Sequence, residues 1–344
     1  MTTDPSTDAS DEPPAAIAPP APQRVAQRPF FGISLKILSA LSFTAMSAVV
    51  KIAIGGGTSV PVPLGELIFF RSFFAMMTVI LWLAYARPLS AAFRTNNVRG
   101  HIRRGLIGSA GMFFGFAALH HLPLPDATAL SYAAPLLSVV LASLVLKETI
   151  RIYRWTAVLF GFVGVIIMLL PHLSPESAGA HGSPIGIAFA LGGAICAAFA
   201  IIEVRKLTAT EHTGAIVVYF SLTTTVLSLV TFAFGRFNPA YAWIWPTATD
   251  FALLTAIGFL GGMGQILLTH CYRYADASVI APFDYTSMIW ALMIGWFLFD
   301  QIPDRLVLIG ATVVIASGIF VILRERALGI ERKKQRKAGA SRGL

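Results

Sequence analysis

Residues 305–323 read RLVLIGATVVIASGIFVIL, a run in which Arg305 is the single charged residue. A bilayer core about 30 Å thick needs about 20 apolar residues in a helix, so this run is long enough to cross a membrane. Nine further apolar runs precede it: 31–54, 66–86, 105–122, 127–147, 153–171, 184–204, 214–235, 251–272 and 276–299. Because lipid offers no partner for unpaired backbone groups, the sequence predicts an all-α polytopic membrane protein with ten transmembrane helices.

The composition fits a membrane protein. Of the 344 residues, 56% are hydrophobic and 12% are charged, about half the charged share of a typical soluble domain. A net charge of +9 would suit a nucleic-acid partner, but the basic residues lie in short connections and in the C-terminal tail. Membrane insertion produces this distribution, so no nucleic-acid partner is expected.

The basic residues also predict the orientation of the helices. With the N-terminus in the cytoplasm, 21 of the 26 Lys and Arg residues fall in inner segments. The outer loops hold Arg236 and Arg305, and the three remaining basic residues lie within spans. The positive-inside rule therefore predicts that both termini are cytoplasmic.

The chain divides into two tails and two repeats. Residues 1–29 hold seven Pro and six Ala, a composition that predicts a disordered cytoplasmic tail. Residues 325–344 form a basic cytoplasmic tail suited to anionic lipid headgroups. Between the tails, we expect one five-helix repeat over 30–172 and a second over 183–324.

The repeat prediction rests on matching motifs. Asp126-Ala127-Thr128 and Asp276-Ala277-Ser278 lie 150 residues apart, and each opens a span after a glycine-rich span. The two spans also end in similar polar segments, Lys147-Glu148-Thr149-Ile150 and Asp300-Gln301-Ile302-Pro303. Because five spans per half is an odd number, the second copy enters the membrane inverted. Inverted repeats are typical of secondary transporters that hold substrate near the midplane.

Asp284 is the first candidate site residue. It lies on a face of small residues, which mark helix–helix contacts in lipid, and about 12 Å into its span. An ionised carboxylate there costs on the order of 3 kcal/mol, so Asp284 is expected to be paired, protonated or functional. Gln265 has a similar depth on the preceding helix, so the two are predicted to line one cavity beside Tyr285. A structural pairing of Asp284 and core packing of Tyr285 are the alternatives.

Arg71 is the second deep charge, about 8 Å below the outer surface. It either holds a substrate carboxylate or phosphate or joins helices through backbone carbonyls. Ser131, on the small-residue face of 127–147, and its neighbour Tyr132 complete the candidate substrate-binding or coupling residues. Lys51, near the outer end of the first span, is expected to extend to the membrane interface.

No soluble-type enzyme site is visible in the sequence. It has no metal-ligand spacing on one helix face, no nucleophile–base pair and no ATP-binding element. We therefore expect neither catalysis nor a cofactor or metal site. A proton gradient, another ion gradient or the gradient of a small-molecule substrate would drive transport. No oligomeric state follows from the sequence.

A set of motifs resembles the drug/metabolite transporter superfamily of the EamA-domain type over about residues 30–325. The motifs are Glu66-Leu67-Ile68-Phe69-Phe70-Arg71 with Phe73-Phe74, Arg104-Gly105, Asp126-Ala127-Thr128-Ala129 through Pro135-Leu136, Leu146-Lys147-Glu148 before Arg154-Trp155, Asp276-Ala277-Ser278-Val279-Ile280-Ala281-Pro282-Phe283 with Tyr285, and Gly310 with Gly318.

The resemblance implies a carrier of the bacterial cytoplasmic (inner) membrane that works by alternating access. The most similar members include uptake proteins for S-adenosylmethionine or riboflavin, and other members export amino acids and metabolites. Such relatives often carry a basic residue where this chain has Asp284, which favours a cationic substrate or proton coupling. The alternative from another class is a lipid-flipping or accessory membrane subunit, for which Arg71 is the one deep basic candidate.

Overall fold

The computed structural model describes residues 28–55, 61–86, 95, 97–145, 152–173, 184–207, 211, 213–238, 242–275 and 280–340. The helices are α1 (Pro29–Ile54), α2 (Leu64–Ala86), α4 (Val98–His121), α5 (Leu124–Ser131), α6 (Ala133–Val145), α7 (Ile152–Leu173), α8 (Pro184–Leu207), α9 (Thr213–Phe234), α10 (Ala248–Tyr274), the 3-10 helix η3 (Ala281–Tyr285), α12 (Thr286–Phe299) and α13 (Arg305–Ala340). No strand occurs within these ranges, so the all-α prediction is confirmed.

Eight segments of the described chain are long and apolar enough to cross a membrane, and α5 with α6 counts as one of them. The two remaining predicted spans correspond to α4 and to η3 with α12. Helix α4 carries His and Arg near its ends, and α12 has 14 residues, fewer than a bilayer crossing needs. The polytopic class is confirmed, and the count of ten spans stays a prediction.

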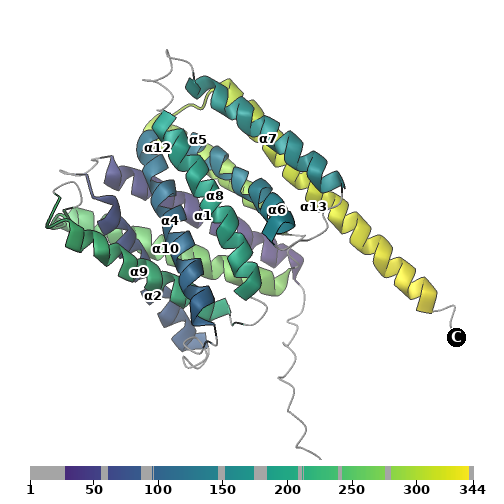
Figure 1. The fold of residues 1–344 in the computed structure, drawn as a ribbon, viewed down its shortest axis with the longest axis horizontal. Helices are drawn as coiled ribbons and strands as arrows, with labels where there is room; N and C mark the ends of the chain where they lie inside the picture. The colour runs from purple at the N-terminus through teal and green to yellow at the C-terminus, as the bar shows by residue number, and fades with distance from the viewer. Residues whose placement is uncertain are drawn as a thin grey trace, which may run out of the picture.

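The main helix contacts join early helices to late ones. Helix α1 packs on α10, α4 on α8, α2 on α9 and α10, and α7 on α13. Figure 1 shows α7 and α13 side by side along one edge of the bundle, with the C-terminal part of α13 extending beyond it. The core lies in clusters that include Val50, Leu67, Met168 and Leu254, and one of these clusters reaches α7 and α13 through Met168 and Val307.

Close glycine contacts hold the edge pair together. A Cβ atom on Gly164 of α7 would lie 2.7 Å from the carbonyl oxygen of Gly310 on α13. The backbones therefore approach more closely than any larger side chain would permit, as is usual at helix interfaces in lipid.

Two predicted helices are interrupted. The sequence predicted one continuous helix over 127–147, but α5 ends at Ser131 and α6 begins at Ala133. The cause is Pro135, which has no N–H to donate to the carbonyl four residues earlier, that of Ser131. In the predicted span 276–299, a 3-10 turn that contains Pro282 precedes α12.

Several residues of the predicted repeat motifs lie outside the described ranges. These are 146–150, which include Lys147-Glu148-Thr149-Ile150, and 276–279, which include Asp276-Ala277-Ser278. The predicted tail over 1–29 is described from residue 28 onward. In the basic tail, helix α13 continues to Ala340.

Candidate substrate site

The two interrupted helices meet inside the bundle. Tyr132 lies between α5 and α6, and Tyr285 is the last residue of η3. Their ring centroids are 5.2 Å apart in an edge-to-face arrangement. The Tyr132 hydroxyl also shares a hydrogen bond of 2.7 Å with the hydroxyl of Ser287, at the start of α12. Helix interruptions from both halves of the chain therefore form one contact region, and interrupted helices often build transporter sites.

A charged pair lies beside these tyrosines. The Lys36 ammonium of α1 is 2.5 Å from a carboxylate oxygen of Asp284 in η3. The Lys36 side chain is 4% exposed, whereas the Asp284 side chain is 56% exposed. Asp284 is also near enough to interact electrostatically with Tyr132 and Tyr285. The sequence predicted that Asp284 would be paired, protonated or functional, and it is paired, with its carboxylate still accessible.

Lys36 was not among the predicted site residues. The charge of Lys36 could have identified it, because Lys36 is a basic residue near the start of the apolar run 31–54. Asp284 lies near the start of the run 276–299, at the same side of the membrane in the predicted topology. A basic and an acidic residue at similar depth in two apolar helices are natural partners. The sequence does not show that α1 and η3 are neighbours, and the fold supplies that fact.

Tyr285 connects η3 to α13 through a glycine. A Cβ atom on Gly318 would overlap the Tyr285 hydroxyl, so this position keeps space for the ring.

The predicted site residue Ser131 ends α5, is exposed, and donates its hydroxyl to the Thr128 carbonyl at 2.6 Å. Lys36, Asp284, Tyr132 and Tyr285 thus place one cation, one anion and two aromatic rings together, a set that suits a zwitterionic ligand with an aromatic group.

Arg71 and Gln265 lie in a second, smaller site. They line a cavity of about 10 Å³ together with Ala75, Val79, Val217, Phe220, Ser221 and Gly261. Such a volume is about that of one water molecule. Asp284 is not in the lining of this cavity, and the prediction that Gln265 and Asp284 line one cavity stays a prediction.

Two other polar residues of the spans bind backbone groups. Glu66 accepts the N–H of Ile244 at 3.0 Å. The Lys51 ammonium donates to the carbonyls of Leu119 and Leu122 at 2.8 and 2.6 Å. Its charge thus satisfies free carbonyls at the C-terminus of α4, and the extension of Lys51 to the membrane interface stays a prediction.

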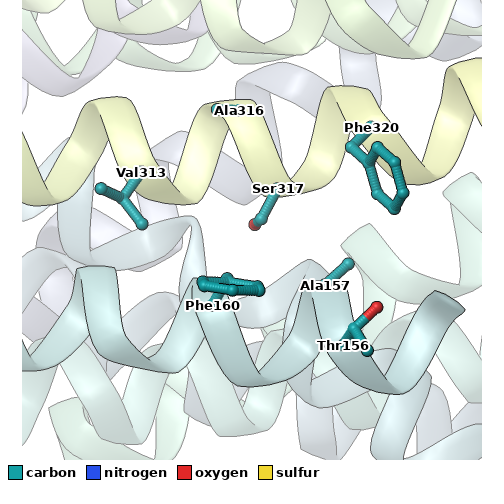
Figure 2. A pocket seen from close by; sticks show the side chains of 7 residues that line it. All are labelled: Thr156, Ala157, Phe160, Val313, Ala316, Ser317 and Phe320. Carbon is teal, nitrogen blue, oxygen red and sulfur yellow. The ribbon is translucent and has the colours of Figure 1, made fainter. Parts of the chain in front are cut away.

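A larger groove of about 360 Å³ lies between α7 and α13. Figure 2 shows side chains from both helices, including Phe160 and Phe320, directed into the gap. Its two hydroxyl groups, on Thr156 and Ser317, donate to carbonyls of their own helices. The groove therefore suits an acyl chain better than a charged metabolite. Within the described chain, no three His, Cys, Asp or Glu residues are grouped for a metal ion.

A bundle of apolar helices with a charged, accessible pair where two interrupted helices meet is typical of multi-pass membrane transporters. The chain belongs to the EamA-like transporter family, whose model matches residues 30–170 and 184–324. This membership confirms the predicted resemblance and the predicted transport function.

Relatives and a solved structure give further comparisons. The chain is 30% identical over 263 residues to the S-adenosylmethionine uptake transporter of Rickettsia bellii, covering 76% of this chain and 84% of that one. It is 29% identical over 288 residues to the pseudopaline exporter of Pseudomonas aeruginosa, covering 84% and 94%. A solved crystal structure with 19% identity and a TM-score of 0.56 covers 86% of this chain and 99% of that one, which supports the fold alone.

Proposed function

We propose that this chain is a secondary transporter that takes up a small metabolite with an amino-acid group, with S-adenosylmethionine as the first candidate. The observation that carries the proposal is the Lys36–Asp284 pair, which is accessible on its Asp284 side. A substrate carboxylate would bind the Lys36 ammonium, and a substrate ammonium or sulfonium would replace that ammonium at Asp284. Such charge-assisted contacts are stronger and more selective than neutral ones.

The aromatic rings favour the same substrate class. Tyr132 and Tyr285 border the charged pair, and their faces attract cations and flat heteroaromatic rings. S-adenosylmethionine has an amino-acid group, a sulfonium and an adenine ring, so it can use every part of the site. Riboflavin has the flat ring but no cation for Asp284, and it is the second candidate.

Alternating access is supported by the helix contacts. Suppose that 30–172 and 183–324 are inverted repeats. The contact of α1 with α10 is then equivalent to the contact of α4 with α8. The contact of α2 with α9 and the contact of α7 with α13 each join a helix to its counterpart in the other repeat. Two halves related in this way can exchange their inner and outer conformations by rocking about the site. We place the chain in the bacterial inner membrane with both termini cytoplasmic, and Asp284 is the residue proposed to couple transport to a proton or another ion.

Two alternatives make different predictions. An exporter of the same fold would use the same site, and one relative is named as an exporter. A lipid-flipping protein needs a lateral groove with basic residues for the headgroup. The groove between α7 and α13 has no basic residue among the side chains that line it, which favours the metabolite transporter.

The test is uptake by the purified chain in liposomes. We expect saturable uptake of radiolabelled S-adenosylmethionine that excess unlabelled substrate prevents and that riboflavin inhibits weakly. Stronger inhibition by riboflavin would overturn the substrate assignment. Absence of uptake together with movement of labelled phospholipid between leaflets would overturn the transporter class and support lipid flipping.

A further inference from the structure

Two arginine side chains inside the bundle have unpaired nitrogen atoms. Arg71 of α2 is 9% exposed, and its Nε has no hydrogen-bond partner. On α4, the Nε and Nη1 atoms of Arg104 are also buried and unpartnered. Guanidinium groups carry a permanent positive charge and five N–H donors in a fixed geometry. Each of these arginines therefore has donors directed into the protein interior.

Arg71 lines the small cavity, and Arg104 lies near it through Phe220. Arg71 and Phe220 both line it, and the Arg104 guanidinium carbon lies 4.3 Å from the centre of the Phe220 ring. Arg104 and Arg71 are near enough to repel one another. The two cations thus share one region between α2, α4, α9 and α10.

Glycines make room for both guanidinium groups. A Cβ atom on Gly261 would lie 3.3 Å from the Arg71 Nε, and a Cβ atom on Gly108 would overlap the Arg104 Nη1. An alanine at either position would displace the guanidinium beside it. The packing of α4 and α10 therefore keeps these charges in place rather than excluding them.

No acidic residue compensates these charges in the described part of the chain. The cavity lining contains no carboxylate. On the helices that carry or contact these arginines, Glu203 binds Arg103 and Lys206, and Glu66 accepts the Ile244 N–H. A buried charge without a counter-charge strongly destabilises a protein, so a ligand of opposite charge is expected.

We propose that this cavity, which Arg71 lines and near which Arg104 lies, binds a small monovalent anion such as chloride. A cavity of about 10 Å³ excludes a whole metabolite, and it suits a single compact ion. Gln265 and Ser221 line the same cavity and add neutral donors. The site is separate from the Lys36–Asp284 pair, so the proposal goes beyond the transport proposal and does not rest on the substrate.

The test compares the thermal stability of the purified protein in sodium chloride and in sodium gluconate at equal ionic strength, without substrate. We expect a saturable rise in Tm with chloride and with bromide, but not with gluconate or sulfate, which are too large for the cavity. Equal Tm values in chloride and gluconate would overturn the proposal and would leave a water molecule as the occupant.

Three variants locate the effect. Arg71→Gln is expected to lose the chloride response, and Arg104→Gln, which removes a nearby charge outside the lining, is expected to weaken it. The Tm of both variants in gluconate should match or exceed that of the wild type because an uncompensated charge is removed. Arg103→Gln is the matched control, because Arg103 stands on the same helix but binds Glu203, and it should keep the response. An unchanged chloride response in both Arg71→Gln and Arg104→Gln would contradict the assignment.

A substrate carboxylate is the other source of an anion. If S-adenosylmethionine raises the Tm through Arg71 while chloride has no effect, the occupant is the substrate and the free-anion proposal is wrong. If either variant fails to fold, bromide located by anomalous scattering in wild-type crystals decides the question. A bromide peak in the cavity beside Arg71 supports the proposal, and no peak there contradicts it.

Discussion

The Lys36 ammonium lies 2.5 Å from an Asp284 carboxylate oxygen, although 247 residues lie between Lys36 and Asp284 in the sequence. The pair is unequal, because Lys36 is buried and the Asp284 side chain is 56% exposed. A ligand therefore reaches the carboxylate first. In the proposed mechanism, the two opposite charges would satisfy one another when substrate is absent, and a zwitterionic substrate would replace both contacts.

Reversing the pair separates its structural role from its binding role. Lys36→Asp and Asp284→Lys each place like charges together, so each variant should be less stable than the wild type. Each should also reduce uptake to less than about a tenth of the wild-type rate, a factor that corresponds to roughly 1.4 kcal/mol. The double variant restores the attraction, so its Tm should recover. Its uptake should stay low because the substrate meets the charges in reversed positions. Full recovery of uptake would show that the pair is merely structural.

Gly318→Ala should impair transport through Tyr285. The new methyl group would overlap the Tyr285 hydroxyl and move the ring away from Tyr132. We expect the initial uptake rate to fall several-fold while the protein still folds. Gly115→Ala is the matched control, since a Cβ atom there meets nothing within 4 Å. Equal uptake rates in the two variants would exclude a role for the ring position.

Lys51→Met should destabilise the protein. It removes two charge-assisted hydrogen bonds to the carbonyls of Leu119 and Leu122, each worth about 1.5–3 kcal/mol. We expect the free energy of unfolding in detergent to fall by about 2 kcal/mol, less than the sum of the two bonds because burying the ammonium has its own cost, whereas Lys51→Arg should keep most of the stability. Wild-type stability of Lys51→Met in denaturant titrations would contradict the capping role.

The predicted topology can be read by cysteine labelling. Phe237, which follows α9, is 87% exposed, and Val98, which begins α4, is 51% exposed. With Cys196 and Cys271 replaced by alanine, Phe237→Cys should react with a membrane-impermeant maleimide added to intact cells. Val98→Cys should react after the cells are opened. The reverse pattern would place both termini outside.

Much of the helical architecture could be predicted from apolar runs, because crossing a bilayer imposes the same length and composition on every helix. The interruptions were missed, although Pro135 and Pro282 were visible signals for them. The run 127–147 has uniform hydropathy, so hydropathy alone does not reveal the helix interruption that the missing N–H of Pro135 causes.

Some of the predicted site residues lie together in the structure. Asp284, Tyr285 and Tyr132 meet where the two halves touch, while Arg71 and Gln265 line a separate cavity. Lys36 was missed because its role depends on α1 lying beside η3, a contact between the two ends of the chain. Local spacing identifies charges that are costly in lipid, but it does not identify their partners.

The most direct test of the central claim is uptake of labelled S-adenosylmethionine by liposomes that contain the Asp284→Asn protein. This substitution keeps the size of the side chain and removes the charge, so we expect normal expression and folding with most of the uptake lost. Glu203→Gln, at a charged pair outside the site, should transport normally. Uptake by Asp284→Asn close to the wild-type rate would contradict the role of Asp284 and the proposed mechanism.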